Sequence, residues 1–480
     1  MNNFKLRMIR TVCGILAAVL LLPVLSGLYA CTSSRPVGDP TGDIVMYTPY
    51  SDRTPSAVTS DPAQTDGPGT VTDVPSNTDN VPGPTGPAAQ TEQPTEAPKP
   101  TLTPGPAGTI PDNSPVYGSA ESFQMVPIQG EEESVYCVTL DENKEYWDCP
   151  VSKIGHIFVH NLVAFPELDL AVNPNSKWQD WNNTTVEYVR LLESVYAKNY
   201  ILIDANYIFN YEYRDGKLIA NLKSTVKLPK GKTGLIISCD NVCFPEDEHG
   251  SGRVDKIAVY NGKIASYTKF ADGSEEYSYE RDVCDITEQF CLKHPDFSFA
   301  GARLMLAVSG YSGILGYRTD SSYAAKGFDV AKEREECMKV IDYLKSHGFY
   351  FGCHSYAHLD INTLSGSKLD NEFEKWNTQV KTLIGYTPFY IYPFGNWTES
   401  DTEQYRRLVA EGFHVMYGTS MQEILVNGTY KNRQAGNIYG ERFIYCGKTM
   451  ILYADKGYYD KYGDAYELYD NEGRYTKLYR

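Results

Sequence analysis

The sequence predicts an α/β fold, a (β/α) barrel with inserted β-hairpins, in the part of the chain that follows residue 115. Apolar runs of strand length alternate there with helical patterns, which is typical of a parallel sheet covered by helices. Two further pairs of runs are joined by Asp-Gly or Asn-Gly, and these dipeptides indicate hairpins. Since barrels of this kind carry their chemistry at the carboxyl ends of the strands, the residues that follow each strand are candidates for a site.

The strands are expected where short runs of aliphatic and aromatic residues are bounded by turn residues. In chain order, the expected single strands are 154–163, 200–204, 233–240, 302–310, 349–355, 389–395, 414–420 and 451–455. One hairpin is expected over 209–223, with its turn at Asp215-Gly216, and another over 256–270, with its turn at Asn261-Gly262.

The helices are expected where apolar side chains recur every three or four residues. These segments are 184–199, 285–294, 329–348, 368–385 and 399–413. Thr184 is a suitable N-cap for the first helix. Gly348 is a suitable end for the third, since glycine readily takes the backbone conformation that terminates a helix.

The first 30 residues are expected to form a lipoprotein-type signal peptide. Three basic residues precede an apolar run at 12–25, which is too short to span a membrane comfortably. The run ends before Cys31, and an acylated Cys31 would anchor the chain to the outer face of the cytoplasmic membrane. Ordinary cleavage after Ala30 would secrete the protein instead. Both alternatives predict an exported protein.

Residues 31–115 are expected to be a disordered linker rich in Pro and Thr. Residues 32–115 hold 17 of the 27 prolines, and no aromatic residue occurs from Ser51 to Val116. Such a composition cannot bury enough apolar surface to fold. The expected organisation is therefore a signal peptide at 1–30, a linker at 31–115 and one folded domain at 116–480.

The formal net charge of −17 argues against two classes of partner. Nucleic acids and anionic membrane surfaces are both bound mainly through basic residues, so neither is expected as a partner of the folded domain. The charge does not exclude a neutral glycan. The domain is expected to be a monomer.

Histidines 354 and 358, in the segment FGCHSYAHLD, point most directly to a function. Two imidazoles four residues apart at the end of a strand can converge on one divalent metal ion, most often zinc. Asp240 ends another expected strand, and His160 lies late in a third. A carboxylate and imidazoles at one barrel mouth suit metal-assisted hydrolysis with Asp240 as the general base. The alternative for Asp240 is a turn or capping role.

These motifs resemble those of the polysaccharide deacetylases with a NodB-like domain, carbohydrate esterase family 4. The family has a distorted (β/α) barrel and removes acetyl groups from glycans with a divalent metal. The segment Ser238 to Asn241 resembles the family's T-F-D-D motif, which implies that Asp240 is the catalytic base and Asn241 a metal ligand. The H-S/T-x-x-H motif is matched by His354 and His358, which implies that both are metal ligands.

Two family motifs are altered in this chain. Residues 391–395 resemble R-P-P-Y-G, with Ile391 in place of the arginine, and the strand expected at 451–455 has Ala454 in place of a late histidine. His160 is the expected substitute for that histidine as general acid, and Arg318 for the arginine as an electrostatic partner. The alternatives are a packed strand histidine and a loop salt bridge.

The resemblance implies a metal-dependent hydrolase, with Zn²⁺ as the expected metal. Its expected substrate is a cell-wall or other extracellular polysaccharide of the N-acetylglucosamine type, such as peptidoglycan, and the bond broken is a carbon–nitrogen amide bond. The alternative function is a degenerate, weakly active or inactive surface lipoprotein that binds glycan without turnover.

Overall fold

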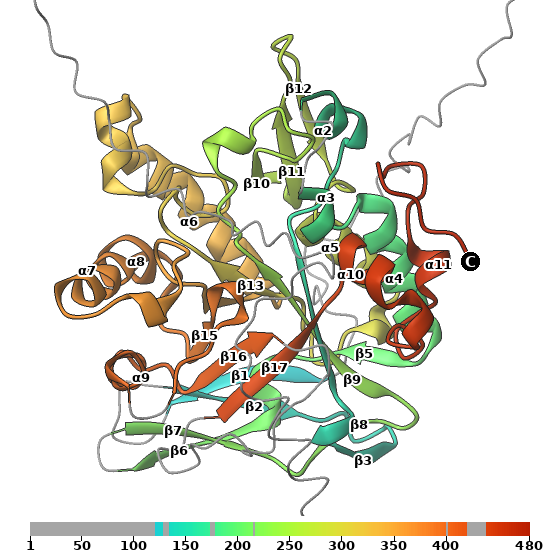
Figure 1. Ribbon diagram of the computed structural model, residues 1–480. Helices are drawn as coiled ribbons and strands as arrows, with labels where there is room; N and C mark the ends of the chain where they lie inside the picture. Colours follow the sequence, from blue (N-terminus) through green and yellow to red (C-terminus); the bar gives the residue numbers. More distant parts are fainter. Residues whose placement is uncertain (1–120, 128–133, 173–177, 215–216, 400–401, 420–437) are drawn as a thin grey trace, which may run out of the picture. The chain divides into compact units, whose positions relative to one another are not determined.

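The computed structural model describes residues 121–127, 134–172, 178–214, 217–399, 402–419 and 438–480 (Figure 1). The expected signal peptide and linker lie outside these residues, and so do the linker's boundaries. Within the described ranges, no helix is both long and apolar enough to cross a membrane.

The centre of the folded part is a closed barrel of parallel strands, as the sequence predicts. Among the described residues, seven strands follow one another around the barrel in chain order. Each strand pairs with the next one, and the ring is closed because the last strand pairs with the first. They are β4 (Gly155–His160), β9 (Thr233–Asp240), β13 (Met305–Val308), β14 (Tyr350–Cys353), β15 (Phe389–Ile391), β16 (Val415–Thr419) and β17 (Ile438–Ile444). The expected strand at 200–204 is β5 (Tyr200–Leu202), which pairs with β9 outside the ring.

Helices surround the barrel (Figure 1). They are α2 (Pro166–Val172), α3 (Trp178–Trp181), α4 (Thr185–Ala197), α5 (Val283–Lys293), α6 (Val330–Ser346), α7 (Ser367–Lys375), α8 (Lys381–Ile384), α9 (Glu403–Ala410), α10 (Gly447–Tyr453) and α11 (Ala465–Leu468). Thr184 caps α4 as expected, and the helix expected over 368–385 is α7 joined to α8 by a π-helical turn.

The strands alternate between two buried faces, which decides what lies inside the barrel. On β9, Ile237 and Cys239 pack outward in the cluster that contains the helices' apolar side chains. Ile236 belongs instead to the inner cluster with Met305 and Tyr350. Since successive side chains of a strand point to opposite faces, Ser238 and Asp240 share the inner face with Ile236. The candidate carboxylate is therefore directed into the barrel.

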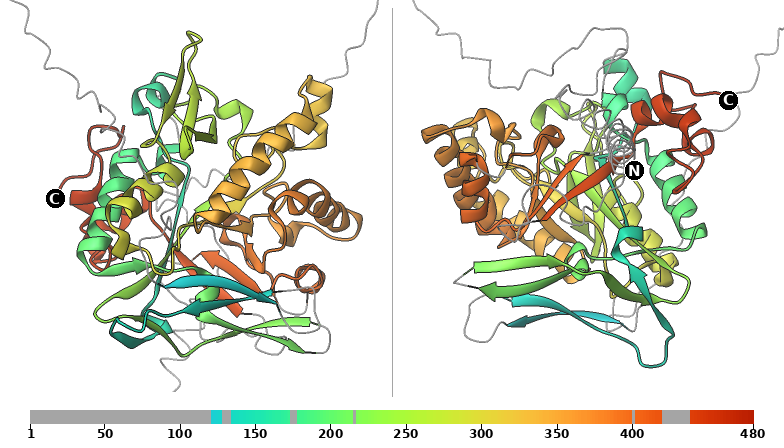
Figure 2. Two further views of the ribbon diagram at one scale, coloured as in Figure 1. Left: turned by 180° about the vertical axis from the view of Figure 1, so that it is seen from behind. Right: turned by 60° about the horizontal axis from the view of Figure 1, so that its bottom comes forward.

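Small antiparallel sheets gather at one end of the barrel (Figure 2). They pair β1 (Ser122–Pro127) with β2 (Ser134–Thr139), β3 (Tyr146–Pro150) with β8 (Thr225–Pro229), and β6 (Phe209–Arg214) with β7 (Lys217–Leu222). Their buried residues, such as Val226 and Leu228, share one apolar cluster with residues near the strands' amino ends, such as Phe389 and Val415. This packing covers the amino-terminal end, so a site is expected at the carboxyl end.

A second sheet is inserted between β9 and α5. The hairpin expected over 256–270 is present as β10 (Lys256–Tyr260) and β11 (Lys263–Lys269), and β12 (Glu275–Ser278) adds a strand that the sequence did not predict. The turn residues Asn261 and Gly262 both have positive φ, of 49° and 73°. Asn-Gly adopts this conformation at little cost, which is why it marks tight hairpins.

The last barrel strand is not the one that the sequence predicts. Residues 451–455 lie in the helix α10 and the helical turn after it, and β17 at 438–444 closes the barrel instead. A short apolar run fits a strand and a buried helical segment equally well, and here α10 packs against α3. Ala454 therefore does not stand at the end of a barrel strand.

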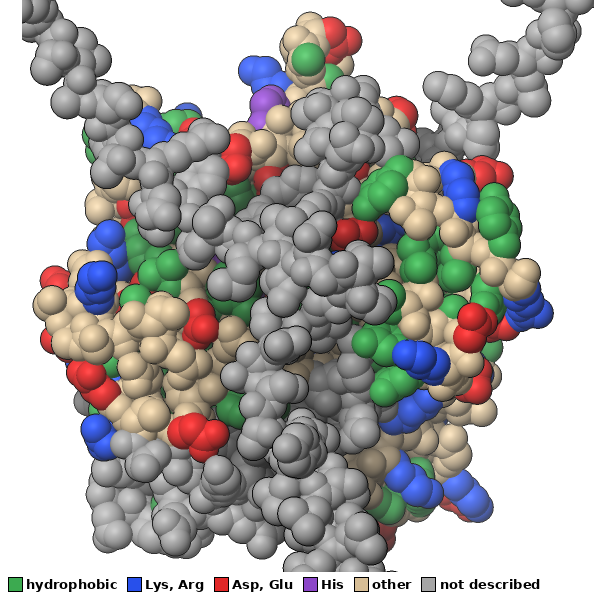
Figure 3. All heavy atoms as spheres, viewed as in Figure 1, with side chains coloured by type: hydrophobic (Ala, Val, Ile, Leu, Met, Phe, Trp, Pro, Cys, Tyr) green, Lys and Arg blue, Asp and Glu red, His purple; other side chains and the backbone are tan. Residues whose placement is uncertain are grey.

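The charged side chains on the face seen in Figure 3 are of both signs and interspersed. Lys and Arg do not gather into one basic surface on the described part of that face.

Candidate active site

Asp240 lies at the carboxyl end of β9 and forms a buried ion pair with an arginine that the sequence analysis missed. Nη1 of Arg442, a fully buried residue of β17, donates to Oδ1 of Asp240 at 2.6 Å. Burial alone would raise the pKa of Asp240, but the charge of Arg442 outweighs it and, with smaller effects from His354 and His160, lowers the pKa to about 2. Asp240 is therefore ionised at neutral pH.

Arg442 is also positioned by a short chain of hydrogen bonds inside the barrel, through Ser238 to His156. Nη1 of Arg442 also lies 3.2 Å from Oγ of Ser238, and that hydroxyl lies 3.2 Å from Nε2 of His156. The guanidinium carbon is 4.4 Å from the ring centre of Phe158. These contacts fix the direction of the arginine, so that its charge is directed at Asp240.

His354 and His358 lie together beyond the end of β14. Their ring centres are 4.9 Å apart. Nδ1 of His354 donates to the backbone oxygen of Ile391 at 3.0 Å, which leaves the lone pair on Nε2. Burial lowers the pKa of His354 to about 4 and that of His358 to about 3, so both rings are neutral at pH 7.

A buried carboxylate organises the loop that carries the two histidines. Oε1 of Glu372 on α7 accepts from Oγ of Ser355 at 2.5 Å and from the backbone nitrogen of Ala357 at 3.0 Å. Oγ of Ser355 in turn accepts from the backbone nitrogen of Leu359 at 3.2 Å. The loop is tied at three points, which holds the histidine pair in one arrangement.

Backbone strain concentrates around these residues. Positive φ values at non-glycine residues occur at nine described positions, and five of these positions lie in the segments that follow β9, β14 and β15: Asn241, Phe244, Ser355, His358 and Phe394. Such conformations cost free energy and persist where the surrounding structure enforces them, often at functional sites. The strain therefore supports a site at this end of the barrel, independently of the sequence motifs.

His160 is brought to the same place. It lies at the end of β4, directly opposite Asp240 in the pairing of β4 with β9. Burial lowers the pKa of His160, and among the described residues its Nδ1 is buried without a hydrogen-bond partner. His160 and Asp240 affect the pKa values of both His354 and His358. The structure thus brings the carboxylate and the three expected histidines together.

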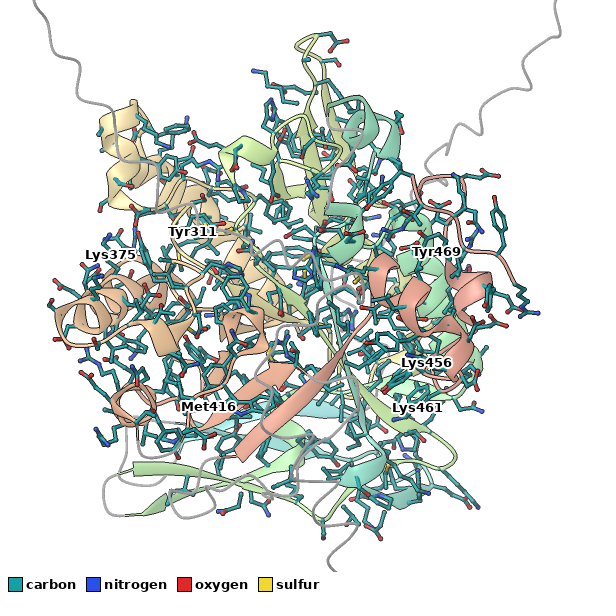
Figure 4. The ribbon with its side chains drawn as sticks, viewed as in Figure 1. Tyr311, Lys375, Met416, Lys456, Lys461 and Tyr469 are labelled. Carbon is teal, nitrogen blue, oxygen red and sulfur yellow. The ribbon has the colours of Figure 1, made fainter. Side chains whose placement is uncertain are left out.

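Asn241 follows Asp240, but its side chain is already engaged. Its Oδ1 accepts from the thiol of Cys243 at 3.2 Å, and its side chain also hydrogen-bonds with Tyr311. Tyr311, labelled in Figure 4, lies in the loop after β13. A carbonyl oxygen has a second lone pair, so this contact does not by itself exclude metal ligation.

Arg318 is not brought to Asp240. Its Nη1 donates to the backbone oxygens of Phe244 and Ser312, at 2.8 Å in each case. These bonds connect the loop after β9 with the loop after β13. The arginine that pairs with Asp240 is Arg442, on a different strand.

The residues present fit a divalent metal in part. Two neutral imidazoles with a free nitrogen on His354 are suitable ligands for a transition metal. Among the described residues, no group of three His, Cys, Asp or Glu side chains is placed to hold a metal ion. The remaining ligands would come from the amide of Asn241, from water or from the substrate.

The comparisons with known proteins found one family model and several similar solved structures. Residues 314–417 match the family model described as polysaccharide deacetylase, a segment that contains His354 and His358 but neither Asp240 nor Arg442. No curated protein matches the chain. Two similar solved structures are a polysaccharide deacetylase from Bacillus cereus and the deacetylase PplD of Streptococcus pyogenes, the latter solved in complex with acetate.

The likeness to both structures is distant. The identities are 9% and 11%, each with a TM-score of 0.33. The similar regions cover 65% of this chain and 67% of the Bacillus protein, and 63% of this chain and 94% of the Streptococcus protein. The matched segment 314–417 runs through the histidine pair, and it makes this part of the chain similar to the polysaccharide deacetylases, in keeping with the closed parallel barrel.

Proposed function

We propose that this protein is a metal-dependent hydrolase that removes acetyl groups from an extracellular polysaccharide. The observation that carries the proposal is an ionised carboxylate, Asp240, grouped with three neutral histidines at the carboxyl end of the barrel strands. The family's substrates are acetylated polysaccharides, and an N-acetylglucosamine-type glycan such as peptidoglycan is the substrate proposed here.

His354 and His358 are the proposed metal ligands, with Asn241 as a third, and zinc suits this donor set. When bound, such a metal would polarise the acetyl carbonyl and stabilise the negative charge that develops on its oxygen. The protein's own contribution is to keep both rings neutral and to fix the loop that carries them through Ser355 and Glu372.

Asp240 is the proposed base. Arg442 occupies only Oδ1, and the other carboxylate oxygen has no hydrogen-bond partner among the described residues. That oxygen can accept a hydrogen bond from an attacking water and then its proton. A carboxylate with a low pKa is a weak base, so its role is to orient the water as much as to remove the proton.

His160 is the proposed proton donor to the leaving nitrogen. It is neutral at pH 7 and faces Asp240 across the strand pair. Its Nδ1, which has no hydrogen-bond partner among the described residues, can take up the proton that Asp240 removes from the attacking water and pass it to the leaving nitrogen. Breaking an amide requires this step, because an amine leaves far more readily once it is protonated.

One specific observation favours a second candidate function, a glycan-binding protein without turnover. The described residues offer no preformed group of three metal-ligating His, Cys, Asp or Glu side chains. In this alternative the barrel mouth would still bind the polysaccharide, but the metal site would be too weak to support hydrolysis.

The two functions are separated by metal analysis combined with acetate release. The purified wild-type protein is expected to hold about one zinc ion and to release acetate from peptidoglycan or from N-acetylglucosamine oligomers. His354→Ala is expected to lose most of the metal and the activity, because it removes one of two imidazole ligands. Glycan binding by the wild type without metal or acetate release would support the second function instead.

Export and anchoring through Cys31 are proposals of the same kind, since residues 1–120 lie outside the described part of the chain. The basic residues, the short apolar run and Cys31 support them. A Cys31→Ser variant is expected to leave the membrane fraction, whereas unchanged membrane association would contradict the lipid anchor.

A further inference from the structure

A group of buried polar side chains lies inside the barrel, on the wall formed by three neighbouring strands. The residues are Tyr417 of β16, Arg442 of β17 and His156 of β4. Tyr417 belongs to the inner cluster. Phe443 pairs with Ile157 and both pack outward, so Arg442 and His156, which precede them on the paired strands, face inward.

The three side chains are close to one another. The ring centres of His156 and Tyr417 are 4.7 Å apart, in an edge-to-face arrangement. Oγ of Ser238 lies between the other two, 3.2 Å from Nε2 of His156 and 3.2 Å from Nη1 of Arg442. The hydrogen-bonding atoms that these contacts leave over therefore lie in one small region of the barrel interior.

Arg442 contributes three unused donor hydrogens to this region. A guanidinium has five N–H groups and accepts no hydrogen bond. Nη1 is engaged by Asp240 and Ser238. Nε, with one hydrogen, and Nη2, with two, are buried and have no partner among the described residues.

His156 and Tyr417 add further donors. Because Arg442 donates to Oγ of Ser238, the hydroxyl hydrogen of Ser238 is left to donate to Nε2 of His156, which is then the unprotonated nitrogen. Burial and then the charge of Arg442 lower the pKa of His156, so the ring is neutral and its single proton lies on Nδ1. Neither this Nδ1 nor the hydroxyl of Tyr417 has a partner in the described part of the chain.

A group made almost entirely of donors requires an acceptor. Buried polar groups are almost always satisfied, by the protein, by water or by an ion. A water molecule would bring two hydrogens of its own, for which these atoms offer only the oxygen of Tyr417, whereas an anion brings none. Arg442 also supplies a positive charge, and its Nε and Nη2 lie on the part of the guanidinium that Asp240 does not engage.

The surroundings limit the size and charge of the acceptor. The pKa of Tyr417 is raised by burial, lowered by Arg442 and raised again by Asp204, so a second carboxyl group besides Asp240 acts on this region. Two carboxyl groups make a divalent anion unfavourable, and the close packing of a barrel interior excludes a large one.

We propose that Arg442, His156 and Tyr417 bind a small monovalent anion, such as chloride, inside the barrel. The donors are Nε and Nη2 of the arginine, Nδ1 of the histidine and the tyrosine hydroxyl. This inference does not rest on the proposed function, because neither the metal nor the glycan takes part in it.

Crystals of the wild-type protein grown in sodium bromide test the site directly, because bromide resembles chloride and scatters X-rays anomalously. An anomalous peak is expected inside the barrel, within hydrogen-bonding distance of Nη2 of Arg442 and of the hydroxyl of Tyr417. Ordered water without an anomalous peak, or bromide on the protein surface only, would overturn the inference. This measurement needs no variant.

Thermal unfolding tests the site in solution, with chloride exchanged for gluconate at constant ionic strength so that screening stays the same. The unfolding temperature of the wild type is expected to rise with chloride until the site is saturated. Tyr417→Phe removes one donor to a charged acceptor, so its half-saturating chloride concentration is expected to be about tenfold higher.

Tyr390→Phe is the matched control for this variant. The hydroxyl of Tyr390 is also buried without a partner among the described residues, but Tyr390 belongs to the outer cluster. Its chloride response is expected to equal that of the wild type. An unfolding temperature of the wild type that does not depend on chloride, or an equal change in both variants, would overturn the inference.

Discussion

Two buried arginine–carboxylate pairs in this barrel differ in how completely they are satisfied. Nε and Nη2 of Arg474 bond to both oxygens of Glu187, at 2.7 and 2.5 Å, and its other donor reaches the backbone of Gln179. Arg442 meets Asp240 through Nη1 alone, and its Nε and Nη2 have no partner among the described residues.

The difference fits a structural role for the first pair and the proposed catalytic role for the second. Buried polar groups are almost always satisfied, and the first pair obeys this rule while it fastens the C-terminal segment to α4. The second pair leaves donors and a carboxylate oxygen without partners among the described residues, at the carboxyl end of the barrel strands. Unused hydrogen-bonding capacity at such a place is what a water or a substrate can occupy.

The largest effect is expected on stability, from Arg474→Met. Removal of the arginine leaves the buried carboxylate of Glu187 without its counter-ion, which typically costs about 3–5 kcal/mol of unfolding free energy. Arg480→Met is the matched control, because that side chain is 65% exposed and pairs at the surface; its cost is expected to be under about 1 kcal/mol. Urea unfolding measures both, and equal losses would show that the buried pair does not anchor the C-terminal segment.

The next effect is expected on catalysis, from Arg442→Lys. Lysine keeps the charge but not the planar geometry that directs it at Asp240, so acetate release is expected to fall by about a hundredfold. The unfolding free energy is expected to fall by less than in Arg474→Met. A variant that is as active as the wild type would contradict the claim that Arg442 replaces the arginine missing at Ile391.

A smaller effect, on the pH dependence of stability, is expected from a third buried carboxylate, Asp282, which forms no ion pair among the described residues. Burial, followed by the nearby Asp285, raises the pKa of Asp282 at the start of α5 to about 7, whereas Arg442 lowers that of Asp240 to about 2. A raised carboxyl pKa stabilises the fold fully below the unfolded value near 3.8, and this contribution is lost as the pH rises toward 7. A lowered carboxyl pKa, as in Asp240, stabilises the fold above the unfolded value, and this contribution is lost as the pH falls toward 2.

Asp282→Asn is therefore expected to reduce the fall in unfolding free energy between pH 4 and pH 8, by on the order of 1 kcal/mol. Asp342→Asn, at an exposed position on α6, is the control and is expected to leave the pH dependence unchanged. Denaturant unfolding at several pH values measures this. An unchanged profile in Asp282→Asn would mean that the Asp282 carboxyl is ionised in the folded protein.

The sequence predicts the parts of this site that depend on local pattern. The barrel strands up to 414–420, the histidine pair and Asp240 at a strand end follow from periodicity and from short motifs. Arg442 does not, because it lies 202 residues from its partner and β17 does not read as an apolar strand. The only sequence signal for Arg442 is its place inside the short segment 438–444, which forms the seventh barrel strand.

The two altered motifs are explained in the same way. Arg318 lies in the loop after β13, but which loop closes over which strand is decided by tertiary packing. The strand expected at 451–455 is an apolar run of five residues, which is too short for its periodicity to distinguish a strand from a buried helical segment. The first error concerns a long-range contact, and the second a short apolar run that becomes helical where it packs against α3.

The most direct test of the account is acetate release by the zinc-loaded wild-type protein and by Asp240→Asn, with zinc content measured on both. The account predicts that the wild type releases acetate from N-acetylglucosamine oligomers. It also predicts that Asp240→Asn keeps its zinc but loses activity by about a thousandfold, because the neutral amide cannot accept the proton of the attacking water. Equal rates for the two proteins, or no acetate from the zinc-loaded wild type, would contradict the assignment of this barrel mouth as a deacetylase site.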